Sequence, residues 1–333
     1  MKSFLKYVII KVYSKFIIIN LWFIYRNKKI KYFYNHSLGF GDSFDYYLDN
    51  YYKIIKNKKN LPLSFGNFNQ QIINFFFSNY KKLFFFIPNF FPYYSIVKEI
   101  KKSSYFRPII SYKLDDNNFM KNEFMARGNA DSKNIILEKL NHYKVDSSIK
   151  NLCNKKYICL FVKHYNNNIN DISNGSTIRQ TTNFKKIIEI VNFLKKKNIY
   201  TIVIGDKLDK GTLILKKYIN KQADFLIDYK INFYDQIFVA NNSLGYIGSS
   251  GGIYYPYFYL KKKILCIDTW AIPTCKISKN FGNLLNLYKK VTINNLTTRL
   301  SYKHLNLSKD CKYNIKETNF SEIKLAINNF LLK

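Results

Sequence analysis

The second half of the chain alternates short apolar runs with amphipathic segments. The clearest runs are YICLFV, IYTIVI and KILCID, and weaker ones are FLIDY and YIGS. Runs of this length that are apolar throughout are typical of strands buried on both faces. In chain order, the predicted strands occupy residues 157–162, 199–204, 225–229, 246–249 and 263–268.

The segments between these runs have the spacing of helices. In NFKKIIEIVNFLKKK, Phe184, Ile187, Val191 and Leu194 share one face, and lysines occupy the other. Further helices are expected over 209–219, 232–242 and 252–260, the last interrupted near Pro256, and over the closing FSEIKLAINNFLLK. Because strands and helices alternate, residues 151–333 are predicted to form a Rossmann-like lobe, a parallel sheet covered on both faces.

The first half is less regular. Residues 31–150 are expected to form a smaller α/β lobe, with a strand, a turn at Gly39 and Gly41, a helix from about residue 43, and a buried strand in KKLFFFIPN. The boundary is placed in the charged, Asn-rich segment around 145–156. The predicted fold is therefore α/β, with two Rossmann-like lobes and a ligand cleft between them.

Residues 1–30 form a basic, apolar segment. Lysines interrupt it, and its longest uncharged run, Phe16 to Tyr25, is ten residues, which is short of a membrane span. The segment fits an interfacial membrane helix, with Trp22 at the headgroup level and basic residues following from Arg26. It equally fits a first helix packed on its own domain, since the lysines do not share one helical face.

The chain carries 54 basic and 21 acidic residues, a net charge of +33. Such an excess suggests nucleic acid, an anionic membrane or phosphorylated ligands, although lysine enrichment by an AT-rich genome gives the same composition. Nucleic acid is not favoured as a partner, because lysine is spread over the chain and no nucleic-acid-binding motif is present. The five cysteines lack CxxC spacing, so a disulfide framework and a zinc site are not expected.

Four of the twelve glycines lie in one stretch of eight residues, GYIGSSGG at 245–252. The stretch contains the predicted strand at 246–249 and leads into a predicted helix, and parallel sheets bind ligands at such a junction. Bare backbone at Gly248, Gly251 and Gly252, with hydroxyls from Ser249 and Ser250, suits the diphosphate of a nucleotide. Tight packing of a turn on the sheet requires the same residues, and both interpretations stay open.

Other candidate residues follow predicted strands or loops. Lys163 and His164 follow the first strand of the second lobe, where histidine suits phosphate contact or proton transfer, although it is also common on surfaces. Arg179 ends a polar loop, where a guanidinium can clamp a diphosphate. Gly205 and Asp206 end the second predicted strand, and Asp228 ends the third. Each aspartate is a candidate to bind the ribose or base of a nucleotide, or else to start a turn. Asp42 in LGFGDSF is a candidate acid or base, or a helix cap.

Together these stretches resemble the GT-B glycosyltransferases, especially a bacterial group near the fucosyltransferase-like branch that serves surface-polysaccharide synthesis. The resemblance covers roughly residues 30–275 and is carried by LGFGDSFDYYL, ICLFVKHY…STIRQTTNF, the helix followed by VIGD, and FVANNSLGYIGSSGGIYYPYFYLKKKILCIDTW. It implies two lobes with a nucleotide-sugar in the cleft, bound chiefly by the carboxy-terminal lobe, and usually no metal.

The resemblance also implies roles for single residues. Ser249, Ser250 and Gly251 would contact the diphosphate or sugar, and Arg179 the donor. Asp206 and Asp228 would border the nucleotide, and Gly39, Gly41 and Asp42 would face the acceptor. Relatives often have His-x-Arg at the end of the first strand of this lobe, where this chain has Phe161 and Lys163, so the charge is kept but the bidentate fork is lost.

The sequence thus predicts a metal-independent glycosyltransferase that uses a nucleotide-sugar as substrate, needs no cofactor, and acts on a glycan or lipid-linked acceptor. Asp42 and His164 are the candidate catalytic bases. We expect a cytoplasmic protein with peripheral contact at the inner face of the plasma membrane. The alternatives are a sugar-nucleotide epimerase of the same fold and a non-catalytic basic protein that binds nucleic acid or acts as a scaffold.

Overall fold

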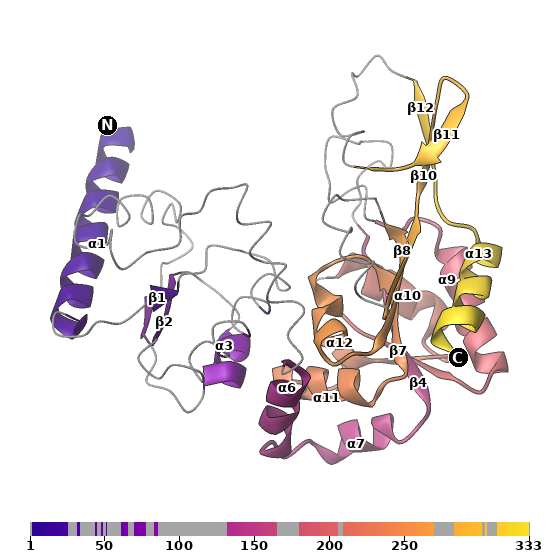
Figure 1. Ribbon diagram of the computed structural model, residues 1–333, viewed down its shortest axis with the longest axis horizontal. Coiled ribbons are helices and arrows are strands. Elements are labelled where there is room, and N and C mark those ends of the chain that lie inside the picture. Colours follow the sequence, from indigo (N-terminus) through magenta and orange to yellow (C-terminus); the bar gives the residue numbers. More distant parts are fainter. Residues whose placement is uncertain are drawn as a thin grey trace. The chain divides into compact units, whose positions relative to one another are not determined.

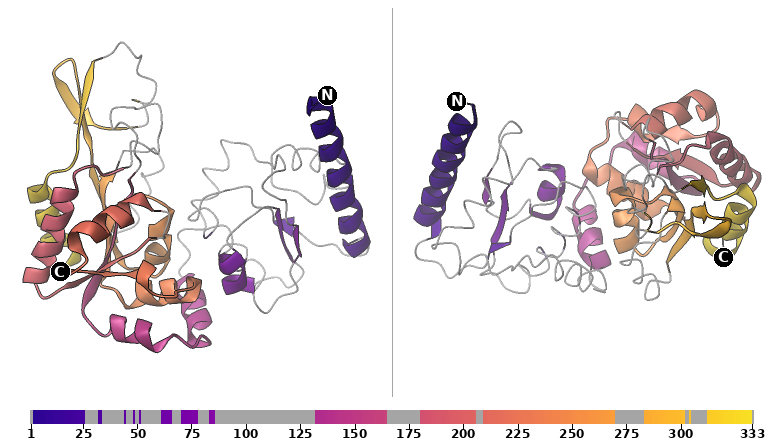
Figure 2. Two further views of the ribbon diagram at one scale, coloured as in Figure 1. Left: turned by 180° about the vertical axis from the view of Figure 1, so that it is seen from behind. Right: turned by 90° about the horizontal axis from the view of Figure 1, so that it is seen from above.

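The computed structural model of the chain divides into two compact units, Met1–Ile135 and Ile136–Lys333 (Figures 1 and 2). The parts of the chain that the structure describes are residues 2–25, 32–33, 44, 48, 51, 61–65, 70–77, 83–85, 132–164, 180–205, 209–269, 283–301, 304 and 312–332. The predicted turn with Gly39, Gly41 and Asp42 lies outside them.

The first unit contains a long helix, α1 (Lys2–Tyr25), and a small parallel sheet. The sheet has the order β1-β2-β3, and α3 (Gln70–Phe77) lies between β2 and β3 in the chain. The strands are Tyr32–Phe33, Leu61–Phe65 and Leu83–Phe85. Phe76 of α3 is fully buried and packs edge-on against Phe44 and Phe75, with ring centroids 5.3 and 5.1 Å apart. The parallel sheet and a helix with buried aromatic residues agree with the predicted α/β character of this unit.

The second unit is built on a six-stranded parallel sheet with the order β6-β5-β4-β7-β8-β9. The strands are β4 (Tyr157–Phe161), β5 (Tyr200–Val203), β6 (Asp224–Phe225), β7 (Gly245–Ser249), β8 (Lys263–Thr269) and β9 (Leu284–Tyr288). All residues of β4 and β7 are buried, as their apolar sequences predict. The predicted mixed α/β fold with a parallel sheet is confirmed for this unit.

Helices cover the two faces of this sheet (Figure 2). The helices described from residue 132 onward are α6 (Ser132–Asn141), α7 (Ser147–Cys153), α9 (Phe184–Lys196), α10 (Lys210–Ile219), α11 (Phe233–Asn242), α12 (Tyr255–Tyr259) and α13 (Phe320–Ala326), which continues as the π-helical turn η5 (Ile327–Leu331).

Side chains that alternate along β4 belong to different faces. Ile158 and Leu160 belong to the core cluster that includes residues of α9, α10 and α13. Tyr157 points the other way, and its hydroxyl donates a 2.6 Å hydrogen bond to the Val239 carbonyl of α11. Since neighbouring residues of a strand face opposite sides, α9, α10 and α13 cover one face, and α11 covers the other.

One strand differs from the sequence-based expectation. The third predicted strand, 225–229, is only two residues long and gives way to a 3-10 turn, η1 (Leu226–Asp228). The lobe boundary around residues 145–156 stays a prediction. Residues before it contact the second unit, since α7 contacts α11 and the Tyr143 ring stacks on Tyr234 with centroids 4.5 Å apart.

A three-stranded antiparallel sheet follows β9 and was not predicted. It has the order β11-β10-β12, and in Figure 1 it lies at one end of the second unit. Its strands are β10 (Lys290–Ile293), β11 (Leu296–Arg299) and β12 (Tyr313–Lys316). Every residue of β11 is exposed, so the strand lacks the alternation of apolar and polar residues that signals a half-buried strand.

Candidate nucleotide site at the strand-order switch

The order of the large sheet reverses between β4 and β7. The chain runs outward from β4 through β5 to β6, and then from β7 in the opposite direction through β8 to β9. Phe161 at the end of β4 pairs with Gly248 near the end of β7. In open parallel sheets the loops on either side of such a switch diverge and leave a crevice at the carboxyl ends of the two strands. Candidate residues at this edge follow β4 and β7.

Two glycines of GYIGSSGG have different surroundings. Gly248 has a φ of +156°, and a Cβ placed there would lie 2.0 Å from the Phe161 carbonyl oxygen. A Cβ on Gly251 would meet no atom within 4 Å among the residues that the structure describes. Gly248 is therefore required by the close approach of β7 to β4, whereas Gly251 borders open space.

The two serines also differ. Ser249 is fully buried, and its Oγ accepts a 2.9 Å hydrogen bond from the Lys163 backbone N–H, so its hydroxyl joins β7 to the residues after β4. The Ser249 carbonyl accepts a 2.7 Å hydrogen bond from the buried Tyr246 hydroxyl. Ser250 Oγ is shielded from solvent but has no hydrogen-bond partner within the described part of the chain. A polar atom in that position retains unused hydrogen-bonding capacity at the switch.

The segment after Gly251 is not a long helix. It forms a three-residue 3-10 turn, η2 (Gly252–Tyr254), followed by the five-residue α12. The predicted interruption near Pro256 is the junction of these two pieces, with the proline in the first turn of α12. Elements this short align few peptide dipoles, so a bound anion must be held by individual groups of the loop and not by a macrodipole.

His164 has a defined orientation. Its Nδ1 lies 3.1 Å from the Thr181 carbonyl oxygen, and its ring packs edge-on against Phe184, with centroids 5.2 Å apart. A carbonyl oxygen only accepts hydrogen bonds, so Nδ1 must carry the proton. This tautomer leaves the lone pair on Nε2. The Thr181 N–H in turn donates to the Lys163 carbonyl at 2.9 Å, which closes the loop between β4 and α9.

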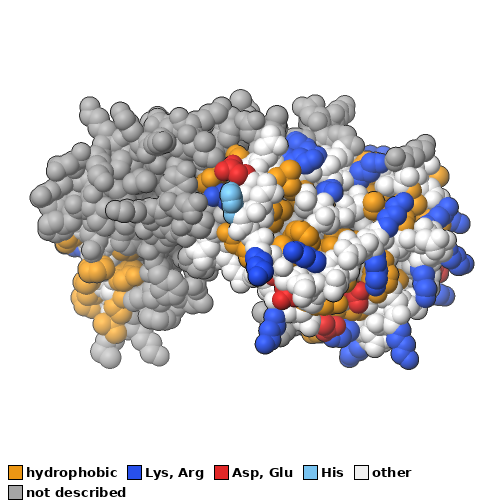
Figure 3. Space-filling view, turned by 90° about the horizontal axis from the view of Figure 1, so that it is seen from below, with side chains coloured by type: hydrophobic (Ala, Val, Ile, Leu, Met, Phe, Trp, Pro, Cys, Tyr) orange, Lys and Arg blue, Asp and Glu red, His pale blue; other side chains and the backbone are white. Residues whose placement is uncertain are grey.

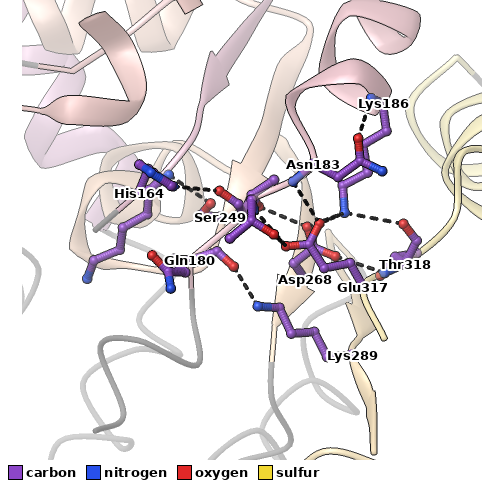
Figure 4. A network of polar contacts seen from close by, with 12 residues as sticks. His164, Gln180, Asn183, Lys186, Ser249, Asp268, Lys289, Glu317 and Thr318 are labelled. Atoms are coloured by element: carbon purple, nitrogen blue, oxygen red, sulfur yellow. Dashed lines mark hydrogen bonds and ion pairs between the residues drawn. The ribbon is translucent and has the colours of Figure 1, made fainter. Parts of the chain in front are cut away.

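A buried charge network, absent from the sequence-based prediction, supports this loop (Figure 4). Lys186 of α9 is 3% exposed, and its Nζ lies 2.5 Å from Asp268 Oδ2 and 2.7 Å from Glu317 Oε2. Asp268, at the end of β8, is fully buried and also accepts hydrogen bonds from the Thr181 hydroxyl at 2.8 Å and the Thr318 N–H at 2.9 Å. Its φ of +53° coincides with an irregularity in the pairing of β8 with β9.

The other two members of the network are Glu317 and Lys289. Burial alone would raise the pKa of Glu317, but the Lys186 ammonium and hydrogen bonds such as that from the Thr182 N–H hold it below its usual value. Lys289 is fully buried, and its Nζ donates to the Gln180 carbonyl at 2.5 Å. Burial lowers the pKa of Lys289, and the nearby carboxylates of Asp268 and Glu317 oppose that effect. The two positive charges of Lys186 and Lys289 therefore compensate the two negative charges of their carboxylate neighbours.

The network holds Thr181 and Thr182, which lie between the strand-order switch and α9, in place. Glu317 Oε1 accepts from both the backbone N–H and the hydroxyl of Thr182, at 2.7 and 2.9 Å. Asp268 holds the Thr181 side chain, and the Thr181 carbonyl meets His164. The charged residues are thus positioning groups for the segment that carries His164. The sequence pattern placed the lysines of α9 on its polar face, but Lys186, directly before Ile187, lies on the buried side, and Asp268 ends an apolar run.

The remaining candidates are dispersed or undescribed. Gly205 packs on α10, because a Cβ there would lie 2.3 Å from Thr212 Oγ1. Asp228 follows the outermost strand β6, is exposed, and pairs with Lys216; β5 and β4 separate that strand from β7. Arg179 and Asp206 lie outside the described residues, as do Gly39, Gly41 and Asp42. Among the residues that the structure describes, no group of three His, Cys, Asp or Glu side chains is arranged to hold a metal ion.

No protein-family model and no curated protein matches this chain. Several solved structures align with it at low identity. ADP-heptose LPS heptosyltransferase II of Escherichia coli is 9% identical, with 91% of this chain and 98% of that chain covered and a TM-score of 0.48. A family 9 glycosyl transferase of Veillonella parvula is also 9% identical, with 78% of this chain and 84% of that chain covered and a TM-score of 0.43.

A putative UDP-N-acetylglucosamine 2-epimerase of Listeria monocytogenes is 8% identical, with 78% of this chain and 83% of that chain covered and a TM-score of 0.47. None of these three descriptions names a fucosyltransferase. At this level of similarity, the likeness carries no conclusion about the activity of this chain.

Proposed function

We propose that this protein is a glycosyltransferase of surface-polysaccharide synthesis that binds a nucleotide-sugar at the switch between β4 and β7. The observation that carries the proposal is the pairing of open space at Gly251 with the unused hydrogen-bonding capacity of Ser250 Oγ, at the sheet edge where Lys163 and His164 also lie. Open parallel sheets bind nucleotides at this position. The acceptor is a glycan or a lipid-linked sugar.

The diphosphate would be bound by single groups of the loop. The missing side chain of Gly251 lets an anion approach the backbone, and the Ser250 hydroxyl can donate to a phosphate oxygen. Lys163 supplies a positive charge on the β4 side, and Arg179, from the adjoining loop, is proposed as the second cation. Because these cations neutralise the leaving diphosphate, we propose a reaction that needs no metal ion.

The proton of the acceptor is assigned to His164. The acceptor hydroxyl oxygen forms a bond to the anomeric carbon while the bond between that carbon and the diphosphate oxygen breaks. His164 Nε2 takes the hydroxyl proton, because Nδ1 is already protonated and held by the Thr181 carbonyl. Asp42 remains the second candidate base, and Asp206 and Asp228 remain proposed neighbours of the nucleotide.

A nucleotide screen tests the proposal. Thermal unfolding is followed with ADP, UDP, GDP, CMP and their sugars, with and without EDTA, for the wild type, for Gly251→Trp, and for the control Tyr218→Trp on the exposed face of α10. One nucleotide is expected to raise the Tm of the wild type and of the control, because a ligand that binds only the folded state stabilises it. The rise in Tm is expected to be the same with and without EDTA. Gly251→Trp fills the open space and is expected to abolish the shift.

Two outcomes contradict this proposal. One is a folded wild type whose Tm no nucleotide changes, and the other is a shift that Gly251→Trp retains. The epimerase alternative is separated by the same donor in a turnover assay. An epimerase converts the nucleotide-sugar without an acceptor, whereas the proposed transferase releases nucleotide at a substantial rate only when an acceptor is added.

We also propose that the protein works in the cytoplasm, in peripheral contact with the inner face of the plasma membrane, where a lipid-linked acceptor would be available. In the described part of the chain, no helix has the length and apolar character that a bilayer crossing requires.

A further inference from the structure

Helix α1 has two apolar faces, and only one of them is buried. Ile10, Ser14 and Ile17 are 9%, 2% and 1% exposed, and their spacing of four and three residues defines one side of the helix. Apolar residues also occupy the opposite side. A helix that needs only to pack on its own domain has one apolar stripe and a polar face toward water.

The second face is formed by large side chains in water. Eight exposed large hydrophobic side chains of the described residues lie on α1: Phe4, Leu5, Tyr7, Val8, Ile9, Val12, Phe16 and Ile19. Leu5, Val8, Val12 and Ile19 follow one another at helical spacing, on the side away from Ile10 and Ile17. Figure 3 shows hydrophobic side chains of α1 gathered in a patch, in contrast to the scattered ones on the visible face of the second unit.

The charges on this helix are all positive. Lys6 and Lys15 are exposed, Lys11 lies at the border of the apolar face, and residues 2–25 contain no Asp or Glu. The chain continues into a basic segment, Arg26 to Lys31. An apolar face bordered by lysines complements an anionic lipid surface, in which acyl chains receive the apolar residues and phosphates receive the ammonium groups.

We propose that the outward face of α1 is a docking surface for an anionic lipid bilayer, with the helix lying in the plane of the headgroups. Lys11 and Lys15 lie midway along the helix, where a spanning orientation would place their charges in the hydrocarbon. In an in-plane orientation Lys11, at the border of the face, lies at the phosphates, and Lys15, on the face itself, reaches them through its long side chain while Leu5, Val8, Val12 and Ile19 enter the acyl region. The inference deepens the membrane contact of the proposed function, but its test does not depend on catalysis.

The test compares two variants with the same change of charge. Val12 on the outward face and Leu325 on α13 are both 62% exposed, so Val12→Glu and Leu325→Glu are matched in exposure and in charge. The full chain is sedimented with vesicles of phosphatidylcholine alone, or with 30% phosphatidylglycerol as a chosen probe. The wild type and Leu325→Glu are expected to bind the anionic vesicles, and Val12→Glu is expected to bind at least fivefold more weakly.

The matched pair distinguishes insertion of α1 into the bilayer from electrostatic attraction of the whole chain to it. The distinction is needed because a chain of net charge +33 is attracted to any anionic surface. Equal binding by the two variants overturns the proposal, as does equal binding of the wild type to neutral and anionic vesicles. Light scattering provides a further test. If the wild type is a dimer and Val12→Glu is a monomer that binds vesicles as well as the wild type, the outward face of α1 binds a second copy of the chain, and the lipid proposal is overturned. Val12→Glu is expected to keep the nucleotide-induced rise in Tm, so a failed nucleotide screen and a failed vesicle assay are distinguishable.

Discussion

Gly248 and Gly251 are three positions apart and have different structural roles. The sequence left two explanations for this glycine-rich stretch, tight packing and contact with a ligand, and each applies to a different residue. A side chain on Gly248 would collide with the Phe161 carbonyl, whereas a methyl group on Gly251 would meet no neighbour in the described part of the chain. Composition alone cannot distinguish them, because the deciding neighbour of Gly248 lies on another strand.

Substitution by alanine is expected to separate the two glycines. Gly248→Ala should lower the free energy of unfolding by about 3 kcal/mol, because it adds strain at positive φ to a steric clash. Gly251→Ala should change it by less than about 0.5 kcal/mol. Urea denaturation of both variants measures the difference, and similar losses at the two positions would show that Gly251 is also a packing residue.

The buried charges act between elements. Lys186 joins α9 to the end of β8 through Asp268, and to the segment between β12 and α13 through Glu317. Buried ion pairs often contribute little net stability compared with apolar packing, but removal of one partner leaves the other charge uncompensated. The network therefore holds three elements in one arrangement, and the position of His164 depends on that arrangement through Thr181.

Neighbouring lysines of α9 provide a matched test of this network. Lys186→Met is expected to cost about 3–5 kcal/mol of unfolding free energy, because it removes the ammonium group that Asp268 and Glu317 both contact directly. Lys185→Met, on the exposed side of the same helix, should stay within about 0.5 kcal/mol of wild type. Chemical denaturation at neutral pH gives both values, and a Lys186→Met variant as stable as Lys185→Met would contradict the role assigned to the network.

At the scale of the whole molecule, the described site and its supporting network belong to the second unit. The hydrophobic cluster beneath the sheet is formed by residues between Ile158 and Leu332. Helices α6 and α7 precede it in the chain, and Tyr143, between them, stacks on Tyr234 of α11 and is hydrogen-bonded to the Asn232 side chain. This unit has the size of an independent domain and a hydrophobic core of its own.

A chain of residues 132–333 is therefore expected to fold cooperatively without the first unit. A chain of residues 151–333, which begins at the boundary predicted from the sequence, lacks α6 and most of α7 and should melt at a lower temperature. Circular dichroism during heating compares the two. A non-cooperative transition for 132–333, or equal midpoints for both chains, would contradict the boundary within α6.

Sequence patterns predicted the parts of the fold that depend on local apolar runs. Strands β4, β5, β7 and β8 were found in this way, and Lys163 and His164 were correctly placed at the sheet edge after β4. Lys186 was missed because it lies among other lysines, and its partners Asp268 and Glu317 are 82 and 131 residues away in the sequence. Burial of a charge depends on such distant partners, which a local pattern does not contain.

The reversal of strand order also determines how the site comes into being. The Lys163 amide and the Ser249 hydroxyl that meet there are 86 residues apart, one in the stretch β4–β6 and the other in β7–β9. The candidate site is thus formed between two consecutive halves of the sheet, and neither half contains it. A nascent chain would lack this site until β7 has left the ribosome. A ligand that contacts both halves would bind only the joined sheet, so its binding would also oppose the separation of the halves.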